Sequence, residues 1–340
     1  MKEIIEKLCN VEGVSGFETS ASEVAKEILE PYVDSVHIDK MGNVLGYKKS
    51  KKENAKTIML DAHIDQIGFM VTEITDEGFL RFRTVGGVDP RMLLGIDVLV
   101  HGKEKIRGVV SNLPPHLSQG AKTAPGIEEM AIDIGFSKEK AEKIVKIGTI
   151  VTFAEEVYCL SSDTITGKCL DDRAGVASII YAMQKLEKVN APLNILVCFS
   201  ACEEVDGKGA KTVSFKERPD FAIAVDVTHA KTPDAPANRT LDMGKLCIGH
   251  GPNLNPKITK NIIKTCKTYD VPYQLDIMEG HTGTNAWHIQ TTRSGIPVGL
   301  ISFALRYMHT PIETIRISDV KNTGKVIAKF IKDYREEEDD

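Results

Sequence analysis

The chain has 340 residues, of which 42% are hydrophobic, 27% charged and 6% aromatic, with a formal net charge of −5. These figures are typical of a globular protein with two domains or one large one, and they exclude disordered and fibrous classes. Because 43 basic residues nearly balance 48 acidic ones and only one tryptophan is present, we expect no nucleic-acid partner.

Neither a membrane span nor a secretory signal is expected. No stretch of about 18 apolar residues occurs, and the first residues interleave charged and apolar side chains instead of forming an apolar core. The seven cysteines are scattered and contain no CxxC motif. Such a set is typical of reduced thiols, so we predict a cytoplasmic protein with neither a disulfide framework nor a zinc knuckle.

The first part of the chain changes character near residue 71. Apolar residues at helical spacing predict two N-terminal helices, which are followed by strands at 44–47 and 57–60. From about residue 71 to residue 157, short alternating runs are separated by closely spaced Gly and Pro. This pattern predicts a small β-barrel or sandwich, interrupted by one helix at 138–145.

After Gly167 the pattern alternates between strands and helices, which is typical of an α/β domain with a mostly parallel sheet. The predicted helices are 175–186, 259–268 and 319–334, and the predicted strands are 193–199, 221–225 and 298–302. The acidic run at 336–340 is typical of a solvated, disordered tail. The sequence therefore predicts an α/β domain into which a β-domain is inserted after the first strands.

Five places put a metal-binding side chain just after an apolar strand or at a turn. They are His63 with Asp65, the pair Asp171-Asp172, the pair Glu203-Glu204, Asp226 and His309. Each has an ordinary explanation by itself, such as a helix cap for an Asp or a solvated loop for paired Glu residues. Because open α/β sheets place ligand-binding groups at the carboxyl ends of their strands, the five together predict a single site.

Two His, two Asp and one Glu could supply the protein ligands of a two-metal site. A shared Asp would give each ion three protein ligands and leave open positions for water. The remaining Glu of the pair would then act as a general base. Spacing alone does not decide whether Asp171 or Asp172 is the shared ligand.

The sequence resembles the M42 family of dinuclear metallo-aminopeptidases, the tetrahedral aminopeptidases of bacteria and archaea. The resemblance covers nearly the whole chain, and its motifs occur in a specific order and spacing. These motifs are VSGFE at 14–18, DAHIDQIGF at 61–69, LDDRAG at 170–175, CEEV at 202–205, VDVT at 225–228 and RYMHTP at 306–311.

This resemblance implies a role for each candidate residue. His63, Asp171 and Asp226 would hold one divalent ion, and Asp171, Glu204 and His309 the other, with zinc or cobalt as the expected metals. Glu203 would be the general base and acid, and Asp65 would orient His63. Family members release N-terminal residues, so the expected substrates are peptides with a free amino terminus.

The resemblance also implies a domain organisation and an assembly. Residues 1–69 and 164–340 would form a catalytic domain of the metallo-exopeptidase type, and residues 70–163 an inserted β-barrel. In the family this insert mediates dimerisation, and dimers often assemble into a hollow dodecamer. We therefore expect a homo-oligomer, from dimer to dodecamer.

One stretch departs from the family pattern. Family members usually carry Gly-Gly-Thr-Asp-Ala before the last strand, whereas this chain has Thr-Gly-Thr-Asn-Ala at 282–286. Asn285 replaces the usual acid, and His281, Trp287 and His288 add bulk and further candidate ligands. The change predicts either a tolerated substitution near the site or an altered substrate pocket in which His281 competes as a ligand.

Three other activities stay open at this point. An amidase or deacylase would act on blocked amines, and Asn285 allows a metal-binding assembly protein without hydrolytic activity. A glycoside hydrolase is suggested by family members labelled endoglucanases, but that chemistry needs two carboxylates and gives no role to the two His residues. The sequence predicts neither the preferred N-terminal residue nor the physiological metal.

Overall fold

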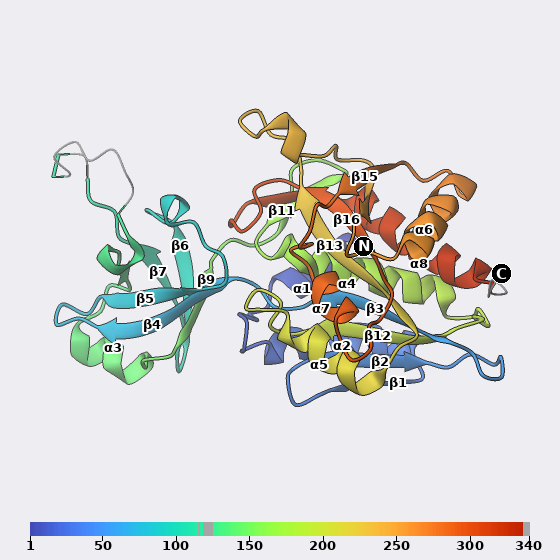
Figure 1. The fold of residues 1–340 in the computed structure, drawn as a ribbon. Helices are drawn as coiled ribbons and strands as arrows, with labels where there is room; N and C mark the ends of the chain where they lie inside the picture. Colours follow the sequence, from blue (N-terminus) through green and yellow to red (C-terminus); the bar gives the residue numbers. More distant parts are fainter. Residues whose placement is uncertain (115, 118–124, 336–340) are drawn as a thin grey trace.

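A computed structural model describes residues 1–114, 116–117 and 125–335, and Figure 1 shows a sheet-based α/β part beside a β-barrel. The acidic run 336–340 lies outside the described residues, so its predicted disorder stays a prediction. Within the described residues, none of the helices has the length and apolar character needed to cross a membrane.

The α/β part is built on one eight-stranded sheet. In spatial order its strands are β1 (Ser35–Ile38), β2 (Val44–Lys48), β12 (Asn194–Ser200), β3 (Thr57–His63), β13 (Phe221–His229), β16 (Val298–Leu305), β14 (Leu246–His250) and β15 (Tyr273–Ile277). The central strands β12, β3, β13 and β16 run parallel to one another. The predicted mostly parallel sheet is therefore confirmed. The strands β1, β14 and β15 were not predicted; β1 and β15 lie at the edges of the sheet and none of their residues is buried.

Helices cover both faces of this sheet because its strands are apolar on both sides. On β3, Ile58 and Leu60 face one hydrophobic core, and Met59 faces the other. The first core holds α1 (Lys2–Cys9), α2 (Thr19–Leu29), α4 (Leu170–Leu186), α6 (Pro256–Thr268) and α8 (Ile317–Asp333), and the second holds α5 (Lys208–Glu217) and α7 (Asn285–Gln290).

The inserted β-structure is a closed antiparallel barrel with strand order β4-β5-β8-β7-β6-β9. Its strands are β4 (Gly68–Ile74), β5 (Leu80–Val85), β6 (Asp97–His101), β7 (Lys105–Val110), β8 (Ile132–Asp133) and β9 (Ile150–Phe153), and α3 (Lys138–Ile144) packs against it. Edge-to-face contacts of Phe69 with Phe82 and Phe153 fill its core. Of the barrel and the sandwich that the sequence allowed, the barrel is present.

The path of the chain brings the two sides of the insertion together at one edge of the sheet. The chain leaves the sheet at the end of β3, forms the barrel, and returns through β10 (Tyr158–Cys159) and β11 (Thr164–Gly167) to the start of α4 (Figure 1). The strand β17 (Glu313–Arg316) pairs with β11 and follows the loop that carries His309. Residues far apart in sequence therefore meet at the carboxyl ends of the parallel strands.

Candidate metal centre

The first element of the site is His63, the last residue of β3, whose ring is almost fully buried. Its Nδ1 lies 3.2 Å from the carbonyl oxygen of Asp65 and 3.5 Å from Asp65 Oδ1. Because both neighbours of Nδ1 are acceptors, this nitrogen carries a proton, and Nε2 is the ring atom that would coordinate a cation. Nε2 lies 3.1 Å from Asp171 Oδ1.

Asp65 also holds the turn that presents the two glutamates. Its Oδ1 accepts a hydrogen bond from the backbone N–H of Glu203 at 2.9 Å, and its Oδ2 accepts one from Glu204 at 3.2 Å and one from the Ser15 hydroxyl at 2.6 Å. Burial raises the pKa of this carboxyl, but the hydrogen bonds with His63 and Ser15 outweigh it and the pKa is lowered. Asp65 is thus an ionised anchor between β3 and the glutamate turn.

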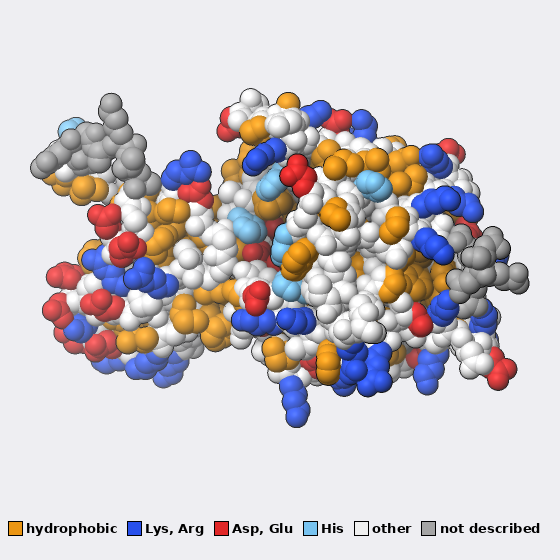
Figure 2. Space-filling model, in the orientation of Figure 1, with side chains coloured by type: hydrophobic (Ala, Val, Ile, Leu, Met, Phe, Trp, Pro, Cys, Tyr) orange, Lys and Arg blue, Asp and Glu red, His pale blue; other side chains and the backbone are white. Residues whose placement is uncertain are grey.

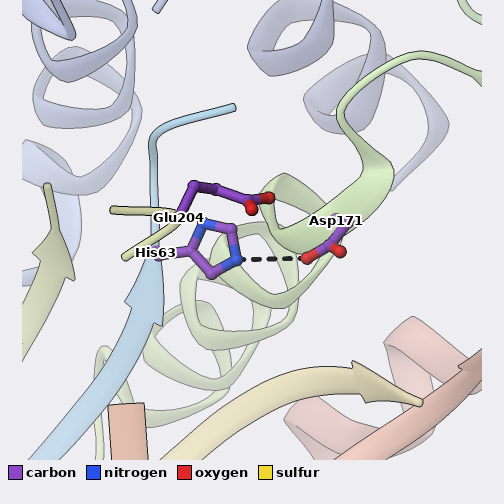
Figure 3. Close-up of side chains that lie close together, drawn as sticks. All are labelled: His63, Asp171 and Glu204. Carbon is purple, nitrogen blue, oxygen red and sulfur yellow. Dashed lines mark hydrogen bonds and ion pairs between the residues drawn. The ribbon is translucent and has the colours of Figure 1, made fainter. Parts of the chain in front are cut away.

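Asp171, at the start of α4, lies between two imidazoles. Its Oδ1 faces His63 Nε2, and its Oδ2 lies 3.4 Å from Nε2 of His309. The same His309 nitrogen lies 3.3 Å from Glu204 Oε1. Figure 3 shows His63, Asp171 and Glu204 converging from three separate segments.

Two groups of side chains are close enough to hold metal ions. In each group the ligand atoms lie within 4.8 Å of one another, and the groups are His63 with Asp171 and Glu204, and His63 with Asp172 and Asp226. Asp172 Oδ1 accepts a hydrogen bond from the Gly175 N–H at 3.1 Å and so caps the helix, while its Oδ2 is buried without a partner. Both Asp171 and Asp172 therefore lie at the site, but Asp171 alone contacts both imidazoles.

The electrostatics of the site show a surplus of buried negative charge. Burial raises the pKa of Asp226 well above its usual range, and the charges of Asp171 and Glu203 add to this effect. Burial also raises the pKa of Glu203 to about 8, in part against the charge of Glu204. Buried carboxylates are costly without compensation. A donor set of imidazoles and carboxylates with such a surplus therefore fits divalent cations.

Glu313, which no motif singled out, positions two of these residues. Its Oε2 accepts a hydrogen bond from the backbone N–H of Asp171 at 3.1 Å, and its Oε1 accepts one from the N–H of His309 at 2.9 Å. The carboxylate is buried, so it fixes the start of α4 relative to the loop before β17. Its contacts are with backbone atoms, and they leave no pattern in the sequence.

The barrel contributes one contact of its own. His309 Nδ1 donates to the carbonyl oxygen of Gly87 at 2.8 Å, which leaves Nε2 facing Asp171 and Glu204. A Cβ atom at Gly87 would lie 3.1 Å from this Nδ1, so a larger residue would crowd the ring. In Figure 2, histidine side chains gather on the surface between the barrel and the sheet, with carboxylates below them.

Two further residues of the motifs, Glu18 and Arg173, stabilise the segments that carry the site. Glu18 Oε1 accepts hydrogen bonds from the backbone N–H groups of Gly16 at 2.7 Å and Cys202 at 3.0 Å, which holds Cys202 at its positive φ of 57° before the glutamate pair. Arg173 is fully buried and donates to the backbone carbonyls of Leu8, Val11 and Ile64. This arginine therefore joins the N-terminal segment to the end of β3 and does not pair with the aspartates.

The stretch at 282–286, which departs from the family pattern, lies at a different place in the structure from the ligands. Asn285 is buried at the start of α7, and its Nδ2 donates to Asp61 Oδ2 at 2.9 Å and to the Ser200 hydroxyl at 2.8 Å. His281 packs on Trp287 with ring centroids 4.2 Å apart. Among the described residues, His281 is in neither group of metal-binding side chains, so the structure gives its proposed competition for the metal no support.

Buried imidazoles and carboxylates at the carboxyl edge of an α/β sheet define a metallohydrolase-type centre, and comparison with known proteins agrees. Residues 42–326 match the family model of the M42 glutamyl aminopeptidases. The chain is 34% identical to the lysyl aminopeptidase of Pyrococcus furiosus, over 98% of this chain and 97% of that protein.

Solved structures are similar over the same extent. The aminopeptidase APDkam598 of Desulfurococcus kamchatkensis superposes with a TM-score of 0.91 and 35% identity, over 98% of this chain and 94% of that chain. The TET1 peptidase of Pyrococcus horikoshii, described as able to assemble into a tetrahedron or a large octahedral shell, gives a TM-score of 0.86 and 28% identity, over 98% and 99%.

The chain therefore belongs to the M42 glutamyl aminopeptidase family. It is an aminopeptidase, a hydrolase that removes N-terminal residues from peptides. The predicted family, fold class and enzyme class are confirmed. Among the activities that the sequence left open, the supported one is hydrolysis of the peptide bond.

Proposed function

We propose that this aminopeptidase works with two divalent cations, zinc or cobalt, at the carboxyl edge of the sheet. The observation that carries the proposal is the position of the Asp171 carboxylate between two imidazoles. Its Oδ1 lies 3.1 Å from His63 Nε2, and its Oδ2 lies 3.4 Å from His309 Nε2. A carboxylate with one oxygen toward each imidazole is suited to bridge two ions. The surplus of buried acids around it supports the same assignment.

Each cation would have three protein ligands. They are His63, Asp171 and Asp226 for one ion, and Asp171, Glu204 and His309 for the other. When bound, the cations polarise the scissile carbonyl and lower the pKa of a water molecule. Asp171 and not Asp172 is assigned to both ions because Asp171 alone lies between the two imidazoles, although Asp172 also lies within ligand distance of His63 and Asp226.

Glu203 is the proposed general base and acid. Its backbone is held by Asp65, whereas its side chain makes no hydrogen bond or ion pair within the part of the chain that the structure describes. The carboxylate is therefore available to take a proton from the attacking water and to pass it to the leaving amine as the peptide C–N bond breaks. Asp65 and Glu313 would hold the surrounding ligands in position through their hydrogen bonds.

The proposed substrates are peptides with a free amino terminus, whose ammonium group suits a site rich in carboxylates. We assign catalysis to residues 1–69 and 164–340, and assembly from dimer to dodecamer to the barrel at 70–163. The shells described for the Pyrococcus horikoshii peptidase support this assembly. All seven cysteines are free, which agrees with a cytoplasmic location.

The proposal is tested by hydrolysis of a dipeptide library with defined metals. A chelator is expected to abolish activity, and zinc or cobalt to restore it. Glu203→Gln should lower kcat by 10²-fold or more, by analogy with typical general-base contributions, while the metal content stays the same. Glu27→Gln, which changes an exposed carboxylate on α2, is the matched control. Unchanged turnover in Glu203→Gln would remove Glu203 from the mechanism.

A further inference from the structure

A cavity of about 630 Å³ lies outside the metal centre, and its walls are rich in charge. Its charged lining residues are Lys231, Lys245, Arg306, Arg316, Asp163 and Asp242. The four basic residues come from separate segments: the loop after β13, the residue before β14, the residue after β16 and the last residue of β17. The tertiary fold, and no local sequence motif, gathers them.

The carboxylates in the cavity offset only half of its positive charge. Asp242 is shared by two lysines, with Oδ1 2.7 Å from Lys231 Nζ and Oδ2 3.0 Å from Lys245 Nζ. Asp163 Oδ2 lies 2.9 Å from Arg316 Nε. Four cations therefore face two carboxylates, which leaves a local surplus of two positive charges in a chain whose net charge is −5.

Arg306 is the cation without a carboxylate partner among the described residues. Its Nε donates to the carbonyl oxygen of Lys231 at 3.1 Å, which sets the direction of the guanidinium. Its backbone pairs with Thr314 through two hydrogen bonds of 3.0 Å. The two terminal nitrogens of this guanidinium are thus held in place and remain available to an oxyanion.

The wall of the cavity is shaped around its arginines. Gly244 has a φ of 90°, and a Cβ atom there would lie 2.6 Å from Arg316 Nη1. The Gly244 N–H donates to Asp319 Oδ2 at 2.8 Å, which ties this loop to the start of α8. Asp242 remains ionised, since the two lysines lower its pKa to about 2. These contacts make the cationic lining part of the fold.

We propose that this cavity binds the phosphate group of a small molecule. A phosphate carries close to two negative charges and several acceptor oxygens, which matches the surplus of two charges and the free guanidinium of Arg306. The volume lies within the range of small-molecule sites, about 300–1,000 Å³, so a phosphate ester fits as well as the free ion. No proposed metal ligand lines the cavity, and the proposal does not depend on the mechanism at the metal centre.

Thermal unfolding of the metal-loaded enzyme at constant ionic strength tests the proposal. The probes are inorganic phosphate and glycerol 3-phosphate, with chloride as the reference. Either probe at saturation is expected to raise Tm by about 2–5 °C. Stabilisation by the ester alone identifies a phosphorylated metabolite as the ligand, and equal stabilisation by both identifies the free ion as sufficient.

Variants distinguish this cavity from the metal centre as the place of binding. Arg306→Gln should weaken phosphate binding about tenfold, the loss of one charge-assisted contact, and Arg306→Lys should retain part of it. Arg107→Gln is the matched control, because this exposed arginine pairs with Asp97 on the barrel. No shift in the wild type, or an equal shift in an Arg306→Gln, Lys245→Gln double variant, would overturn the proposal.

Discussion

The substitution Asn285→Asp restores the residue that the family usually carries, yet this chain is expected to lose stability from it. Asn285 is buried, and its Nδ2 donates to Asp61 Oδ2 at 2.9 Å and to the Ser200 hydroxyl at 2.8 Å. The carboxylate of an aspartate has no such donor. It would also place a second acid against the buried carboxylate of Asp61, where two adjacent carboxylates cannot both ionise.

The cost follows from the two hydrogen bonds and from the proton that the new pair must take up. The bond to Asp61 involves a charge and is worth about 1.5–3 kcal/mol, and the bond to Ser200 is worth about 0.5–1.5 kcal/mol. A proton shared between the two acids restores one hydrogen bond between them. Taking up this proton costs about 1.4 kcal/mol for each unit by which the pKa of one acid must rise. We therefore expect Asn285→Asp to lower the free energy of unfolding by about 2–4 kcal/mol at pH 8.

Urea unfolding followed by circular dichroism measures this loss. The variant Asp61→Asn, Asn285→Asp exchanges acid and amide across the same contact and should recover most of the stability. Asn54→Asp, at an exposed loop position, is the control and should stay within about 0.5 kcal/mol of the wild type. Equal stability of Asn285→Asp and the wild type, or an exchanged pair no better than Asn285→Asp, would refute the reasoning.

Three further predictions concern the site, the barrel and the metal. Glu313→Gln should weaken metal binding about 10–100-fold in a competition titration, because one acceptor for the N–H groups of Asp171 and His309 becomes a donor; unchanged affinity would contradict this role. Burial lowers the pKa of His101 to about 4, below its unfolded value of 6.5, so its stabilising effect is present above pH 6.5 and lost as the pH falls to 4. Between pH 7 and pH 4, the free energy of unfolding of His101→Gln should therefore fall by about 2 kcal/mol less than that of the wild type, after allowance for partial exposure. Urea unfolding at the two pH values measures this difference, and an equal fall in both proteins would exclude the effect. Chelation should lower Tm, since the buried carboxylates then repel one another without a cation, and a Tm independent of metal would argue against a bound ion.

The sequence predicts the candidate ligands because each has a local signature. In the sequence, His63, Asp226 and the Glu203-Glu204 pair follow apolar runs. In the structure His63 is the last residue of β3 and Asp226 lies within β13, which continues to His229, and parallel strands bring such positions together. Asp171 and Asp172 were not separable by spacing, since both come at the start of the same helix. Their different contacts, with two imidazoles for one and with the N–H of Gly175 for the other, exist only once the strands and α4 are packed.

The contacts of two supporting residues could not be predicted for a different reason. Glu18 stands in a recognised motif and Glu313 does not, but both act through backbone N–H groups, which every residue except proline possesses, so their partners leave no trace in the sequence. Asp61 stood inside a recognised motif, but its partner Asn285 lies 224 residues further along the chain. A long-range buried hydrogen bond of this kind is a property of the packed core and has no periodic pattern.

The Gly87 contact shows that the barrel and the metal centre are not independent parts. A histidine ligand uses one ring nitrogen for the metal, and the partner of the other nitrogen sets the tautomer and the direction of the ring. For His63 that partner comes from its own strand end, through Asp65. For His309 it is the carbonyl oxygen of Gly87, in the segment that follows the barrel strand β5. The geometry of one of the two imidazoles therefore depends on how the barrel packs against the sheet, so a change in that packing would reach the site through a single hydrogen bond.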